Sequence, residues 1–135
     1  MELQTGDVFQ YHFLWSEQHK RGETGGRKKR PTCVTITIAN PDHPEDASVY
    51  LCPITTKRPA LNAPHIEVPD TEARRANLTI QPCYIILNEI NKDYPARSYV
   101  LEDREPQGRF SAKFMSDLRQ ILIAQFDDVQ ITPRA

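Results

Sequence analysis

Long apolar runs are missing from this sequence. No stretch approaches the roughly 18 consecutive apolar residues of a membrane span, and the first seven residues lack the charged and apolar segments of a signal peptide. We therefore expect a cytoplasmic protein with no membrane partner. Cysteine is also scarce. Cys33, Cys52 and Cys83 are an odd number, widely spaced and without a CxxC pair, so we expect buried free thiols.

A large net charge is missing as well. The 17 Lys and Arg residues against 18 Asp and Glu give a net charge of −1, which excludes a globally basic nucleic-acid binder but not a local basic patch. Glycine is scarce at five residues, whereas eleven prolines indicate short elements joined by rigid turns. With 39% hydrophobic and 26% charged residues, the 135-residue chain has the composition of one folded domain, residues 1–135.

Alternating and apolar patterns predict a mainly β domain. We expect strands over residues 8–15, 32–39, 48–54, 65–68, 83–87 and 99–101. A short helical turn is expected over 70–76, and a longer helix after the N-cap residue Ser111, where apolar residues recur at helical spacing. Strands followed by a single C-terminal helix indicate an α+β fold, mainly β, with a small bent sheet or barrel.

The segment 16–30 interrupts this pattern. It has no apolar residue and holds three of the five glycines, so we expect a mobile surface loop. Between residues 20 and 30 there are six basic residues and one acid, a local charge of +5. Such a loop can follow a phosphate backbone, and the neighbouring Trp15 can stack on bases. A solvated loop without a ligand is the alternative, and neither a P-loop nor a GxGxxG motif is present.

Two further features concern chemistry. Thr55 and Thr56 follow Pro53 and Ile54 at the end of an expected strand, where their hydroxyls can donate to a phosphate oxygen or simply cap a loop. The four histidines have no paired spacing typical of metal sites, and we expect neither a metal nor another cofactor.

These features occur in a particular order along the chain. The sequence has Gly6-Asp7 before the first strand, Arg30-Pro31 after the basic loop, Pro53-Ile54-Thr55-Thr56, then residues 65–68 (HIEV) and a helix after Gly108. This co-linear set resembles the PemK/MazF family of toxin endoribonucleases from bacterial toxin–antitoxin systems, and the resemblance covers nearly the whole chain. It implies an SH3-like, CcdB/MazF-type small barrel with a C-terminal helix, a homodimer, and a cognate antitoxin protein as partner.

The resemblance also implies a reaction. Family members cut single-stranded RNA without metal: the 2′-hydroxyl attacks its own phosphate, leaving 2′,3′-cyclic phosphate and 5′-hydroxyl ends, so DNA is no substrate. Arg30, Thr55 and Glu23 match the family's catalytic arginine, hydroxyl and loop glutamate. The residues expected to bind substrate are Arg27, Lys28, Lys29, Thr56, Trp15, Lys57 and Glu89.

The chain departs from the family pattern at two places. Glu23 lies seven residues before Arg30, a longer spacing than is usual in the family, and residues 88–91 read NEIN where many members have Asp-Gln-x-Arg/Lys. Glu89 there has either an acidic or a purely structural role. Two other functions therefore stay open: a catalytically degenerate member that only binds an antitoxin, and a CcdB-like poison directed at gyrase. The basic loop together with Arg30 and Thr55 favours RNA.

Overall fold

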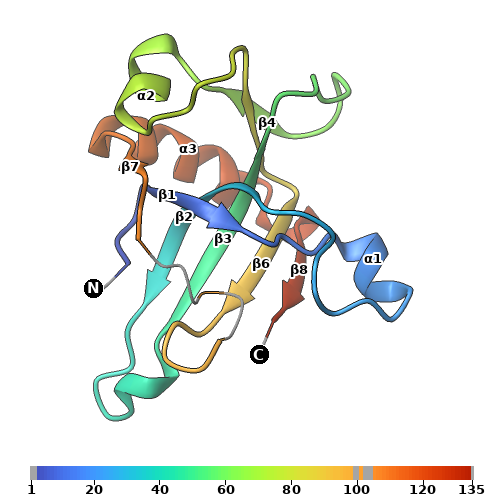
Figure 1. Cartoon of the computed structure of the whole chain (residues 1–135), viewed down its shortest axis with the longest axis vertical. Helices are drawn as coiled ribbons and strands as arrows, with labels where there is room; N and C mark the ends of the chain where they lie inside the picture. Colours follow the sequence, from blue (N-terminus) through green and yellow to red (C-terminus); the bar gives the residue numbers. More distant parts are fainter. Residues whose placement is uncertain (1–2, 99–100, 102–104, 135) are drawn as a thin grey trace.

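The computed structural model describes residues 3–98, 101 and 105–134. The chain folds as an α+β domain that consists mainly of strands (Figure 1). The strands are β1 Asp7–Tyr11, β2 Arg30–Ile38, β3 Ser48–Thr55, β4 His65–Glu67, β5 Tyr84–Ile86, β6 Glu89–Asp93, β7 Gly108–Arg109 and β8 Gln130–Pro133. The helices are α1 Ser16–Lys20, α2 Asp70–Arg75 and α3 Ala112–Ala124, with 3₁₀ turns at Pro44–Asp46 and Phe126–Asp128.

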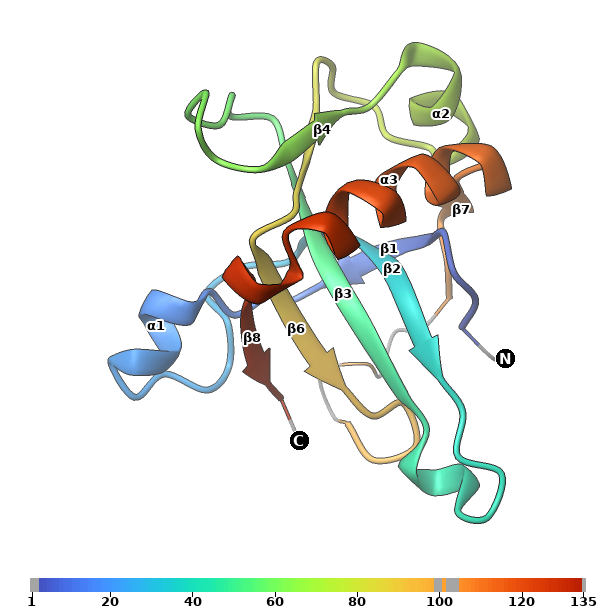
Figure 2. The ribbon, with the colours of Figure 1, turned by 180° about the vertical axis from the view of Figure 1, so that it is seen from behind.

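The strands form one curled sheet that resembles half of a barrel. Its order is β4-β5-β3-β2-β1-β7, with β6 paired to β3 and β8 paired to β6. All described pairs are antiparallel except β6 with β8. The long strand β3 pairs with β6 over its first half and with β5 at its end, so the sheet divides along this strand. Figures 1 and 2 show β4, β5 and α2 at one end and the β2–β3 turn at the other.

Helix α3 covers one face of the sheet (Figure 2). The Ser111 side chain accepts a hydrogen bond from the backbone N–H of Phe114 at 3.2 Å, which caps the first turn as the sequence predicts. Phe114, Met115, Leu118 and Leu122 point from α3 into a core with side chains of β1, β2 and β3. The opposite face of the sheet buries a second cluster that is richer in aromatic rings, made of Leu3, Phe9, Tyr11, Phe13, Val34, Val49, Leu51 and Leu101. Both faces of β1 are therefore buried near its centre.

Most of the predicted elements are confirmed, and two predictions are wrong. The expected strand over 8–15 ends at Tyr11, and the segment expected to be entirely loop contains helix α1. That helix forms because the Glu89 carboxylate, from β6, accepts hydrogen bonds from the N–H of Ser16 at 2.9 Å and from its hydroxyl at 2.6 Å. Strands β6 and β8 were not predicted. The strand expected over 99–101 lies largely outside the described residues, which omit 99 and 100.

The three cysteines are buried free thiols, as predicted. Burial raises the pKa of each, to about 12 for Cys52. Among the residues that the structure describes, no helix is both long and apolar enough to cross a membrane.

Candidate functional site

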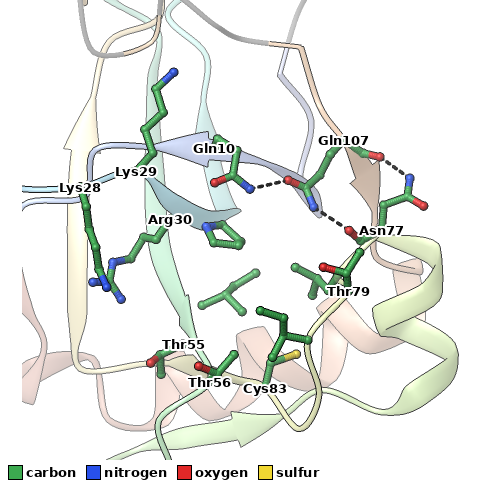
Figure 3. Close-up of a pocket in the computed structure, with 14 residues that line it drawn as sticks. Gln10, Lys28, Lys29, Arg30, Thr55, Thr56, Asn77, Thr79, Cys83 and Gln107 are labelled. Carbon is green, nitrogen blue, oxygen red and sulfur yellow. Dashed lines mark hydrogen bonds between the residues drawn. The ribbon is translucent and has the colours of Figure 1, made fainter.

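A groove of about 570 Å³ opens where the end of the basic loop meets the end of β3 (Figure 3). Three segments far apart in the sequence form its walls: the start of β2 with β1 beside it, the end of β3, and the chain between α2 and β5 together with Gln107. Its lining residues are Gln10, Lys28, Lys29, Arg30, Pro31, Ile54, Thr55, Thr56, Asn77, Leu78, Thr79, Ile80, Cys83 and Gln107. These include three cations and no acid.

Arg30 is the cation held most firmly at this groove. It opens β2 opposite Tyr11 of β1, and its guanidinium lies over the Trp15 ring, 5.2 Å from the ring centroid. Burial lowers the pKa of Arg30, but an arginine remains charged at neutral pH. Its Nε–H is the one buried side-chain polar group of the described residues without a hydrogen-bond partner. Arg30 as a whole is only half-buried and its guanidinium has no acceptor among the described residues, so its charge is open to an anion.

The basic loop divides into paired and unpaired cations. Arg21 pairs with Glu17 at 2.6 Å, and Arg27 pairs with Glu23 at 2.8 Å. Four cations, Lys20, Lys28, Lys29 and Arg30, have no acidic partner within the described residues. The last three of them line the groove.

Thr55 and Thr56 lie at the base of the groove (Figure 3). Thr55 is the last residue of β3, and its Oγ1 accepts a hydrogen bond from the backbone N–H of Lys57 at 3.1 Å. This bond occupies one lone pair and leaves the hydroxyl hydrogen free to donate to a ligand. The structure thus brings Arg30, Lys28, Lys29, Thr55 and Thr56 to one groove, although residues 30 and 55 are far apart in the sequence.

Other expected site residues lie elsewhere. The Glu23 carboxylate accepts two hydrogen bonds from Arg27, at 3.0 and 2.8 Å, and this contact lowers the pKa of Glu23. Glu23 does not line the groove, nor does Lys57. The Glu89 carboxylate accepts hydrogen bonds from Ser16 at the start of α1. Of the two roles expected for Glu89, this contact corresponds to the structural one.

Trp15 and Arg27 line a smaller hollow of about 280 Å³ that shares Lys28 and Arg30 with the groove. The Trp15 ring meets Phe13 edge-on, with 5.1 Å between ring centroids, so it is held in place from one side while Arg30 lies over it. The aromatic ring expected to stack on bases is therefore next to the groove.

The amides that line the groove were not predicted. Gln10 comes from β1, Asn77 follows α2, and Gln107 precedes β7, so no local motif connects them. The antiparallel pairing of β1 with β7, in which Val8 is opposite Gly108, brings Gln107 to Gln10. A two-residue strand such as β7 has no recognisable sequence pattern, and this pairing could not be expected.

Cys83 lines the groove as a buried thiol whose pKa is raised by burial, which makes it a poor nucleophile. Within the described residues, no group of three or more His, Cys, Asp or Glu side chains is placed to hold a metal ion. No protein-family model matches the sequence, and no curated protein matches it.

Proposed function

We propose that this chain is a metal-independent endoribonuclease that cuts single-stranded RNA to 2′,3′-cyclic phosphate and 5′-hydroxyl ends. One observation carries the proposal: Arg30, whose guanidinium has no hydrogen-bond partner among the described residues, lines a groove with Lys28, Lys29 and the free hydroxyl hydrogen of Thr55, and no lining acid neutralises them. A phosphate diester supplies the negative charge and the acceptor oxygens that these donors lack.

The groove suits the charge that develops during this reaction. Attack of the 2′-hydroxyl on phosphorus adds negative charge to the equatorial oxygens, and fixed donors stabilise that charge most strongly when little water competes. We assign this task to Arg30 and to the Thr55 hydroxyl. Arg30 stays charged throughout, so the leaving 5′-oxygen takes its proton from water.

No carboxylate or imidazole lines the groove within the described residues, so the proton of the attacking hydroxyl passes to water. We assign no step to Glu23 because Arg27 holds its carboxylate outside the groove. The proposed catalysis therefore depends on positioning and on charge stabilisation more than on a general base.

From the resemblance to the PemK/MazF toxins we also propose a fold, an oligomeric state and a protein partner. In this proposal the domain is an SH3-like, CcdB/MazF-type barrel that forms a cytoplasmic homodimer, and a cognate antitoxin covers the groove. The curled, mainly antiparallel sheet with a C-terminal helix supports this fold assignment.

The test is to incubate the purified protein with a long unstructured RNA in excess EDTA and to identify the new ends. We expect discrete cuts with cyclic-phosphate and 5′-hydroxyl ends, no cleavage of DNA of the same sequence, and loss of cleavage in Arg30→Ala. Arg74→Ala is the matched control because Arg74 is an exposed arginine of α2 that does not line the groove.

Intact RNA would contradict the proposal. RNA that is bound but not cut would favour the catalytically degenerate alternative, and a protein that neither binds nor cuts RNA would favour a protein-directed poison.

A further inference from the structure

A chain of hydrogen-bonded amides starts at Gln10, on the strand next to Arg30, and crosses to Gln107 and Asn77 (Figure 3). Gln10 Nε2 donates to Gln107 Oε1 at 2.8 Å, and Gln107 Nε2 donates to the backbone carbonyls of Ala76 at 3.1 Å and Asn77 at 2.9 Å. The Asn77 side chain in turn donates to the carbonyl of Gln107. Every hydrogen-bonding group of the Gln107 side-chain amide is therefore used inside the protein.

This chain fixes which way the Gln10 amide faces. A backbone carbonyl can only accept, so the Gln107 group that meets Ala76 and Asn77 must be its NH₂. Its oxygen must then face Gln10, which has to present its own NH₂ to that oxygen. The Gln10 oxygen and second N–H have no partner among the described residues, and Figure 3 shows the oxygen on the side away from Gln107, toward Arg30.

Apolar side chains, among them Pro31, Ile54 and Leu78, also line the groove. The groove therefore offers cations, apolar surface and, at Gln10, one oriented acceptor and donor. A nucleotide has the same three parts: a phosphate, the flat apolar faces of its base, and a base edge with hydrogen-bonding groups.

We infer that Gln10 reads the edge of the nucleobase next to the cleaved phosphate and thereby sets the base preference at one position of the RNA. This inference rests on the ribonuclease function proposed above. An amide with one free acceptor and one free donor matches a base edge that offers a donor beside an acceptor, as adenine does, and rejects bases whose edge is displaced or reversed.

Gln107 is the positioning residue for Gln10, and the fold holds it in place. A Cβ at Gly108 would lie 2.5 Å from the Arg75 carbonyl oxygen and 2.6 Å from Ala76 Cα, so glycine lets β7 press against the end of α2. This close approach puts Gln107 within reach of carbonyls at the C-terminal end of α2, which lack intrahelical donors. Gln107 would make these bonds in a purely structural role too, so the base preference of the cut decides between the two roles.

The experiment compares the wild type, Gln10→Ala and Gln130→Ala on a single-stranded RNA of randomised sequence in EDTA, with all 5′-hydroxyl ends sequenced. Gln10 and Gln130 both have exposed side chains, and Gln130 of β8 does not line the groove. In the wild type and in Gln130→Ala we expect one position beside the cut to show a preference of about 5- to 100-fold for one base. Gln10→Ala should lose that preference and keep those at other positions.

Gln107→Leu provides a second variant. It should weaken the preference at the same position because Gln10 is no longer oriented, while RNAs with every base at that position are still cut.

The inference and the proposed function fail in different ways. If the wild type leaves RNA intact, the ribonuclease proposal is contradicted, and the inference is overturned with it. If the wild type cuts RNA and Gln10→Ala keeps the wild-type preference at every position, only the inference is overturned. Equal loss of the preference in Gln130→Ala also overturns it.

Discussion

Arg30 and Arg134 both place a guanidinium over an aromatic ring, 5.2 Å from the centroid of Trp15 and 5.3 Å from that of Tyr11. Their hydrogen bonds differ. Arg134 donates to the Tyr11 hydroxyl, the His12 carbonyl and Asn91 Oδ1 at 3.2, 2.7 and 3.0 Å, and to the Thr24 carbonyl at 3.1 Å. Arg30 has no side-chain hydrogen bond within the described residues, although its Nε is buried. A cation with its donors satisfied holds a fold together, whereas a half-buried cation without a hydrogen-bond partner is available for a ligand.

The partners of Arg134 are themselves held in a buried network. The Tyr11 hydroxyl and the Ser98 hydroxyl each donate to Asp93 Oδ2 at 2.7 Å, and Asn91 bonds the backbone of Leu14 in both directions. Arg134 also reaches the basic loop through Thr24. This network therefore joins β1, β6 and the residue after β8 to the basic loop.

The largest effect is expected for Arg30→Ala. It should lower the RNA cleavage rate by about 10²- to 10³-fold, the usual cost of losing one donor to a transition-state oxyanion. The free energy of unfolding should change by at most about 1 kcal/mol because no partner is left unpaired. Cleavage rates and urea unfolding measure the two quantities, with Arg74→Ala as control. Cleavage at the wild-type rate would show that Arg30 is not in the site.

Arg134→Ala should lower the free energy of unfolding and leave most of the RNA cleavage intact. It leaves four acceptors, three of them in part-buried hydrogen bonds, without their charged donor, and we expect a loss of about 2 kcal/mol in the free energy of unfolding. Urea denaturation at neutral pH measures this loss. A variant as stable as the wild type would contradict the structural role assigned to Arg134.

The double variant Lys28→Ala/Lys29→Ala should weaken RNA binding without abolishing cleavage. For a single strand, two lost phosphate contacts reduce the slope of log affinity against log salt by about 1.4. Binding titrations at several salt concentrations measure the slope, and Lys20→Ala/Lys113→Ala serves as a control because neither lysine lines the groove. An unchanged slope would mean that these lysines do not meet phosphate.

Tyr11, a hydrogen-bond partner of Arg134, gives a prediction for the stability of the protein at alkaline pH. Burial, and then the charge of Asp93, raise the pKa of Tyr11 well above its usual value of about 10. The folded protein thus keeps this phenol protonated where the unfolded chain ionises it, so its contribution to stability is complete below pH 10 and is lost as the pH rises further. The unfolding free energy should fall less steeply above pH 10 in Tyr11→Phe than in the wild type. Identical slopes would contradict a buried Tyr11.

The smallest effect is expected for Glu23→Gln. Its carboxylate is paired with Arg27 and does not line the groove, so removal of the charge should leave cleavage nearly unchanged. A general base contributes about 10²- to 10⁴-fold, and a loss of that size would place Glu23 in the reaction. The measurement compares the RNA cleavage rate of Glu23→Gln with that of Glu17→Gln, the other paired glutamate of this region.

Local patterns predicted most of the fold. The alternation over 32–39 and the apolar spacing after Ser111 correspond to β2 and α3 because both depend on neighbouring residues. Helix α1 was missed because its first turn is capped by Glu89, 73 residues away. For the site, the sequence indicated a basic loop and Thr55, but the amide chain depends on the contact of Gln10 with Gln107, 97 residues apart. No local residue pattern predicts a contact between residues so far apart in the sequence.

The most direct test of the contrast between the two arginines is the cleavage rate of single-stranded RNA in EDTA by Arg30→Ala and Arg134→Ala, measured where both variants are folded. We predict that Arg30→Ala loses cleavage by about 10²-fold or more and that Arg134→Ala retains most of it. Equal loss in both variants, or cleavage by Arg30→Ala at the wild-type rate, would contradict the assignment of Arg30 to the reaction.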